Sequence, residues 1–111
     1  MAGDELVDYG LVRRRLLRRS ANVLALVLSK HPDLPVLTWT VTPDMLRGHA
    51  DVCDLDPGRD RQIFEVWAGA LPATEGGDPI AVLDDAGVTR LRANRRAHGV
   101  PVVLTAAVHP F

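Results

Sequence analysis

A long proline-free stretch from Asp4 to His31 most constrains what this chain can fold into. Apolar residues recur along it at the three- and four-residue spacing that lines one face of a helix. The principal row consists of Tyr9, Val12, Leu16, Ser20, Val23 and Val27, in which Ser20 is the one small polar residue. Pro32 and Pro35 then end the element, because a proline nitrogen cannot donate a backbone hydrogen bond. The sequence therefore predicts one long amphipathic helix.

After this helix, the sequence predicts two groups of strands with a second helix between them. Residues 36–42 and 46–53 predict a β-hairpin around the turn Pro43-Asp44. Asp56 and Pro57 favour the start of a helix that runs to about Leu71. Strands are then predicted at 80–83, 88–95 and 100–108, and the last is apolar on both faces, as a central strand would be.

This order, helix-strand-strand-helix-strand-strand with one extra short strand, predicts an α+β fold. We expect an antiparallel sheet of four or five strands with both helices packed on one face. Trp39, Phe64 and Trp67 should share the core between them. The length of 111 residues fits a single domain over residues 1–111.

Composition indicates the cellular compartment in which the chain works and the kind of organism it comes from. Cys53 is the only cysteine, which excludes an intramolecular disulfide and fits a reducing compartment such as the cytoplasm. The first residues carry no basic segment and the apolar runs are too short to cross a bilayer, so neither export nor a membrane partner is expected. Arginine replaces lysine almost throughout, as in proteins of high-GC bacteria and their phages. No motif for a cofactor or metal is recognised, and none is expected.

Arginine is concentrated in two places that are candidates for binding nucleic acid or an acidic partner. The candidates are Arg14, Arg15, Arg18 and Arg19 in the first helix, and Arg90 and Arg92 in a later strand. Guanidinium groups bind phosphates through paired hydrogen bonds. The alternative is a solvated helix face, since the net charge is −1 and dedicated nucleic-acid binders usually carry a basic excess.

A polar face of the sheet is a second candidate. Strand parity places Thr38, Thr40, His49 and Asp51 on the outward side, together with Arg47. If the strand order brings Arg90, Arg92 and Asn94 alongside, this face could hold an acidic ligand; the alternative is an ordinary solvated sheet face. His49, Asp51 and Cys53 also suggest a metal or a Cys–His catalyst, but neighbours at this spacing stand about 7 Å apart.

These observations favour a non-enzymatic binding or protein-interaction domain that associates with itself. A regulatory role is one option for such a domain. A homodimer is expected because the first helix and the last strand hold more apolar surface than a small monomer covers. Another protein as partner stays open. The alternatives are a nucleic-acid-binding protein that uses the arginine helix, and a small enzyme or metal site around His49.

Overall fold

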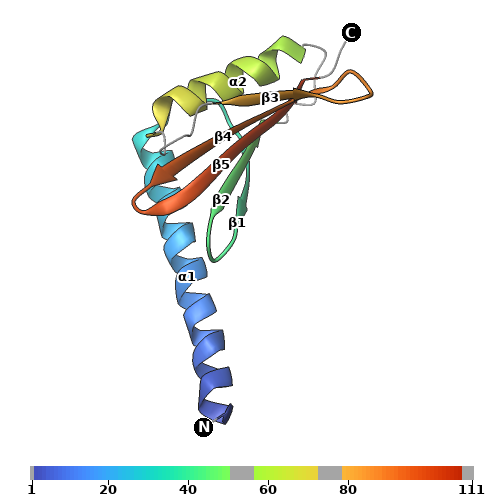
Figure 1. The fold of residues 1–111 in the computed structure, drawn as a ribbon. Coiled ribbons are helices and arrows are strands. Elements are labelled where there is room, and N and C mark those ends of the chain that lie inside the picture. Colours follow the sequence, from blue (N-terminus) through green and yellow to red (C-terminus); the bar gives the residue numbers. More distant parts are fainter. Residues whose placement is uncertain (1, 51–56, 73–78, 109–111) are drawn as a thin grey trace.

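A computed structural model describes residues 2–50, 57–72 and 79–108 (Figure 1). Its elements are α1 (Ala2–Lys30), β1 (Thr38–Val41), β2 (Leu46–Ala50), α2 (Pro57–Ala70), β3 (Ile80–Leu83), β4 (Thr89–Ala97) and β5 (Val100–Val108). The predicted α+β fold and order of elements are confirmed, with β3 as the extra short strand. Asp56, the expected helix cap, lies outside the described residues.

The five strands form one sheet in the order β1-β2-β5-β4-β3, so the apolar β5 is central as its sequence predicts. The pairs β1–β2, β3–β4 and β4–β5 are antiparallel, whereas β2 and β5 run parallel. The sheet is therefore mixed, which differs from the antiparallel sheet expected. The reason is that α2 carries the chain across the sheet, so that β3 starts in the direction of β2. Two successive hairpins then return β5 to that direction.

The core lies between the sheet and the two helices, which cover the same face (Figure 1). Trp67 and Phe64 of α2 are 1% and 2% exposed and pack over Leu46 of β2 and Leu104 of β5. The ring of Trp39 meets that of Trp67 edge to face, with centroids 5.5 Å apart. The core predicted for Trp39, Phe64 and Trp67 is confirmed.

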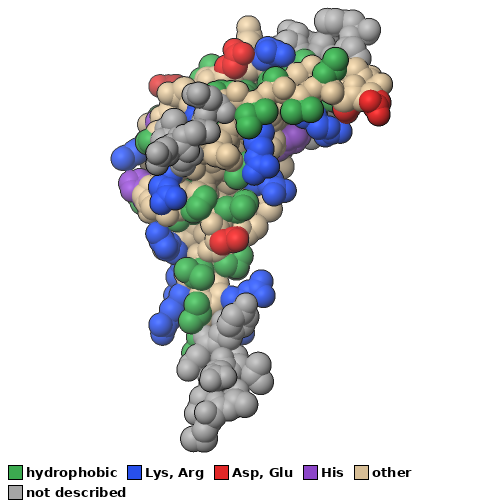
Figure 2. Space-filling model, in the orientation of Figure 1, with side chains coloured by type: hydrophobic (Ala, Val, Ile, Leu, Met, Phe, Trp, Pro, Cys, Tyr) green, Lys and Arg blue, Asp and Glu red, His purple; other side chains and the backbone are tan. Residues whose placement is uncertain are grey.

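Helix α1 packs on the body only through its second half. Ser20, Val23 and Val27 are buried, whereas Val12 and Leu16 of the same predicted row are exposed. The first half projects away from the sheet and from α2 (Figure 1). Figure 2 shows hydrophobic side chains lying between basic ones on the projecting part. The predicted long helix is confirmed, but of its apolar row Val12 and Leu16 are not covered by any described residue.

A buried arginine connects β4 to the end of α2. Arg95 is 6% exposed and faces inward, and its Nε donates to the carbonyl oxygen of Ala68 at 2.8 Å. The last turn of α2 contains no basic residue of its own, and its carbonyl end favours a positive charge. The strand predicted at 88–95 is longer at its end, because β4 continues to Ala97. The sheet thus supplies the cation that the helix sequence lacks.

The turn between β4 and β5 makes a first testable prediction. His98 and Gly99 both have positive φ, 47° and 80°, as the two central residues of a type I′ hairpin turn do. Gly99→Ala should lower the free energy of unfolding by about 1–2 kcal/mol, because a Cβ strains this conformation. His98→Asn is the control and should change little, since asparagine tolerates positive φ. Urea titration of both variants checks this, and an unchanged Gly99→Ala midpoint would contradict it.

Candidate functional site

The face of the sheet opposite the helices, here called the open face, collects the polar residues that the sequence placed outward. His49 of β2 pairs in register with Thr105 of β5, which pairs with Arg92 of β4. One row further along the strands, Arg47 pairs with Val103 and Val103 with Asn94. Because β5 lies between β2 and β4, residues from two distant parts of the chain meet over the central strand.

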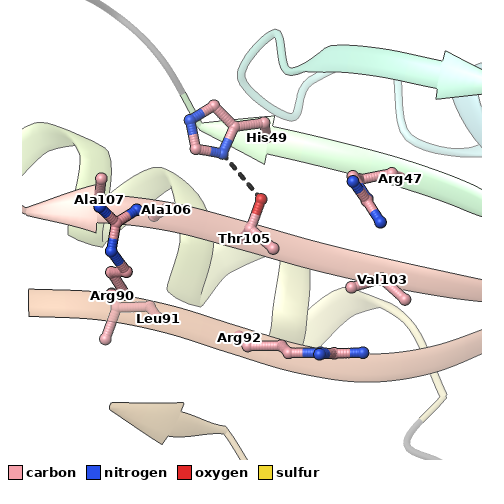
Figure 3. A pocket seen from close by; sticks show the side chains of 9 residues that line it. All are labelled: Arg47, His49, Arg90, Leu91, Arg92, Val103, Thr105, Ala106 and Ala107. Atoms are coloured by element: carbon pink, nitrogen blue, oxygen red, sulfur yellow. Dashed lines mark hydrogen bonds between the residues drawn. The ribbon is translucent and has the colours of Figure 1, made fainter. Parts of the chain in front are cut away.

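A hollow of about 500 Å³ lies on this face (Figure 3). The described residues that line it are Arg47, His49, Arg90, Leu91, Arg92, Val103, Thr105, Ala106 and Ala107. Figure 3 shows Val103 and Thr105 between Arg47 on one side and Arg92 on the other. The lining contains three arginines and, among the described residues, no acidic side chain. Its floor is therefore largely apolar and its rim is positive.

The three arginines differ in how far their charge is compensated. The Nε of Arg90 lies 3.5 Å from a carboxylate oxygen of Asp84, so part of its charge is offset. Arg47 and Arg92 are exposed, and neither makes an ion pair or a side-chain hydrogen bond to another described residue. Their strands flank β5, which puts the two backbones about 10 Å apart. Two guanidinium groups without a partner among the described residues thus border one hollow from opposite sides.

A histidine and a threonine hydroxyl lie between these arginines. The Nδ1 of His49 is 2.7 Å from Oγ1 of Thr105, a hydrogen bond whose donor depends on the imidazole tautomer. This distance is also within the reach of a base and a hydroxyl nucleophile. Among the described residues, however, no third group bonds the other ring nitrogen to orient it. The arrangement is better suited to donating hydrogen bonds to a bound acceptor.

The remaining sheet residues proposed from the sequence divide into two groups. Thr38 and Thr40 of β1 are exposed and pair in register with His49 and Arg47, so they extend the open face to the edge of the sheet. Asp51 and Cys53 lie outside the described residues, and the metal or Cys–His interpretation stays a prediction. Within the described part of the chain, no group of His, Cys, Asp and Glu side chains could hold a metal ion.

The arginines of the first helix do not join this site. Arg14, Arg15, Arg18 and Arg19 are exposed on α1, and none of them lines the hollow. Arg19 lies instead against the β4–β5 turn, where a Cβ added to Gly99 would stand 2.9 Å from its Nη2. Of the arginines predicted to bind nucleic acid or an acidic partner, only Arg90 and Arg92 line the hollow, and the four on α1 lie apart from it.

Thr105 and Val103 were not among the site residues predicted from the sequence. Their signal was strand parity, since the buried Leu104 between them fixes both on the opposite face of β5. Of the described helices, none is both long and apolar enough to cross a membrane. No protein-family model, curated protein or solved structure matches this chain.

Proposed function

We propose that this protein is a binding domain that takes an anionic ligand, bearing phosphate or carboxylate groups, on the open face of its sheet. The observation that carries the proposal is the pair Arg47 and Arg92, two guanidinium groups without ionic partners among the described residues, on opposite sides of one hollow. A planar guanidinium binds an oxyanion through two parallel hydrogen bonds. Thr105 and His49 add hydrogen-bonding groups between them.

The size and lining of the hollow favour a small molecule over a nucleic acid. Its volume of about 500 Å³ falls in the range typical of small-ligand sites. Val103 and Ala107 offer apolar floor for the uncharged part of such a ligand. No Phe, Tyr or Trp is among the described residues that line it, so bases would lack the large aromatic rings on which nucleic-acid binders stack them. The chain also lacks the basic excess of a nucleic-acid binder, with a net charge of −1.

Three expectations from the sequence are part of the same proposal. The single cysteine fits a reducing compartment, and we place the protein in the cytoplasm on that basis. A second copy of the chain is the protein partner that we propose, because the exposed Leu11, Val12, Leu16 and Leu17 of α1 have no cover among the described residues. Binding rather than catalysis is proposed, since the described residues around His49 and Thr105 include no group that orients the imidazole.

Calorimetric titration with inorganic pyrophosphate tests the anion site. We expect saturable binding that weakens at least about tenfold in the double variant Arg47→Gln/Arg92→Gln, because charge-assisted hydrogen bonds are the strongest contacts available there. Arg14→Gln/Arg18→Gln is the matched control, since it removes the same charge from α1. The control should bind pyrophosphate within about twofold of the unmodified protein if only exposed, distant charges are lost.

Three results would overturn the proposal. The first is the absence of saturable binding to pyrophosphate, and the second is equal weakening in both double variants, which would indicate a diffuse charge effect. The third is retention on a DNA or RNA column that falls steeply with salt and is lost in the Arg14→Gln/Arg18→Gln variant alone. That last result would support the nucleic-acid alternative, since each phosphate contact releases counterions.

A further inference from the structure

The proposed anion site contains an internal hydrogen bond, which joins His49 of β2 to Thr105 of β5. Both side chains are half-buried and line the hollow, and Nδ1 of His49 lies 2.7 Å from Oγ1 of Thr105. Figure 3 shows the second ring nitrogen, Nε2, on the side of the imidazole away from Thr105. Among the described residues, Nε2 has no hydrogen-bond partner. The threonine oxygen and Nε2 are therefore the two atoms through which this pair can meet a ligand.

The number of protons on the pair decides what it offers to that ligand. A neutral imidazole carries one N–H and a threonine carries one O–H. One of these two protons occupies the mutual hydrogen bond, so the neutral pair presents one donor and one acceptor, whichever tautomer is present. A charged imidazole adds a third proton. Its Nδ1–H then donates to Oγ1, and both Nε2–H and the threonine O–H are left to donate.

The charged form of the pair is the one that suits a fully ionised oxyanion. Such a group has acceptor oxygens and no proton to donate. The neutral pair sets one lone pair against it, and that acceptor stays unsatisfied. The charged pair sets two donors against it, and the donor on the imidazolium makes the stronger, charge-assisted kind of hydrogen bond. Binding of an ionised oxyanion and protonation of His49 should therefore favour each other.

The surroundings of His49 leave it as the group that changes charge near neutral pH. Histidine ordinarily gains its charge between about pH 8 and 5, whereas arginine stays charged throughout. The charged groups around the hollow are Arg47 on the same strand, Arg90 and Arg92 on β4, and Asp84 through its ion pair with Arg90. Strands β5 and β1 face His49 with threonine and alanine side chains, which do not titrate. Among the described residues that line the hollow, His49 alone changes charge in this range.

We propose that the open face binds a fully ionised oxyanion together with one proton, which His49 takes up from solvent. The inference rests on the proposed anion site, and it specifies the protonation state of the ligand and the pH dependence of binding. In the bound state, Nδ1–H of His49 donates to Oγ1 of Thr105, while Nε2–H and the threonine hydroxyl donate to the ligand. Affinity for the anion therefore rises as the pH falls and histidine gains its charge.

Sulfate tests this inference, because it is a single oxyanion that stays fully ionised in this range, whereas phosphate groups titrate at about pH 6. Calorimetric titration should show sulfate binding at least about tenfold tighter at about pH 5.5 than at about pH 8.5. His49→Asn should reduce this ratio to less than about twofold, since asparagine does not titrate. The matched control is His98→Asn, because His98 is exposed and is not among the lining residues, and it should keep the tenfold ratio.

Two further measurements separate proton uptake from a general effect of charge. Titration in two buffers of different ionisation enthalpy counts protons, and we expect uptake of up to about one proton per sulfate near neutral pH, and none in His49→Asn. Thr105→Val removes the hydroxyl donor and should weaken sulfate binding at low pH by about fivefold, whereas Thr105→Ser should stay within about twofold. Circular dichroism checks that each variant keeps its secondary structure.

The outcomes distinguish this inference from the anion site on which it rests. Sulfate binding of equal strength at both pH values overturns the inference and leaves the anion site in place, as does pyrophosphate binding without sulfate binding. A pH dependence that survives in His49→Asn also overturns it, and so does one lost in Asp51→Asn, which changes a carboxylate outside the described residues. If neither anion binds, the anion site itself is wrong and the inference fails with it.

Discussion

Replacing Trp67 with alanine should lower the free energy of unfolding by about 3–5 kcal/mol, the largest stability effect we expect in this protein. The indole is 1% exposed at the centre of the core. Its Nε1 donates a hydrogen bond of 2.7 Å to the carbonyl oxygen of Pro35. The rings of Trp39 and His31 meet it edge to face at 5.5 and 6.0 Å. Alanine would leave a cavity that touches α2, the sheet and the segment after α1.

Trp67→Phe separates the packing from the hydrogen bond. Phenylalanine keeps an aromatic ring against Trp39 but leaves the Pro35 carbonyl without its donor, which should cost about 1–3 kcal/mol. Denaturant titration, followed by circular dichroism, measures both variants. A loss below about 1 kcal/mol in Trp67→Ala would mean that α2 does not pack as described.

Gly48→Val should be the second most damaging change, with an expected loss of about 3 kcal/mol from overpacking. Gly48 of β2 pairs in register with Trp39 of β1, whose ring occupies the space that a side chain would need. A Cβ at this position would stand 2.9 Å from Cδ1 of Leu37 and 3.0 Å from Cζ3 of Trp39. The ring cannot move freely, because it is stacked edge to face on Trp67.

A graded series makes this test specific. Gly48→Ala should lower the free energy of unfolding by about 1 kcal/mol, because the added Cβ forces small shifts but does not carry the two γ methyl groups of valine. Gly69→Ala in α2, where an added Cβ would meet no described atom within 4 Å beyond its chain neighbours and the helix's own backbone, should instead stabilise the protein by up to about 1 kcal/mol. Thermal unfolding of the three variants provides the comparison. Equal effects of valine and alanine at position 48 would show that Trp39 does not fill this space.

The same packing fixes the geometry of the open face. Leu46, Gly48 and Ala50 are buried on the helix side, and successive side chains of a strand point to opposite faces. Arg47 and His49 must therefore point to the open side. The core thus determines where the candidate binding residues lie, even though none of them belongs to it.

Local patterns in the sequence were enough to define the elements and their faces. The spacing of apolar residues predicted both helices, and alternation predicted the β1–β2 hairpin and the strand at 88–95. Apolar runs predicted the strands at 80–83 and 100–108. Parity along the strands also placed Thr38, Thr40, His49, Arg90 and Arg92 on the side away from the core. These features depend on residues within a few positions of each other, so a single sequence contains the information.

The tertiary structure alone decided which strands are neighbours. Strand β5 lies between β2 and β4 and runs parallel to β2. This placement brings Arg47 and His49 close to Thr105 and Arg92, which are more than 40 positions away in the chain. Long-range packing likewise decides that Arg95 turns inward to the end of α2, and that Val23 and Val27 of α1 are buried while Val12 and Leu16 stay exposed. The physical reason is that periodicity fixes the face on which a side chain lies, whereas pairing and coverage depend on how distant apolar surfaces fit together.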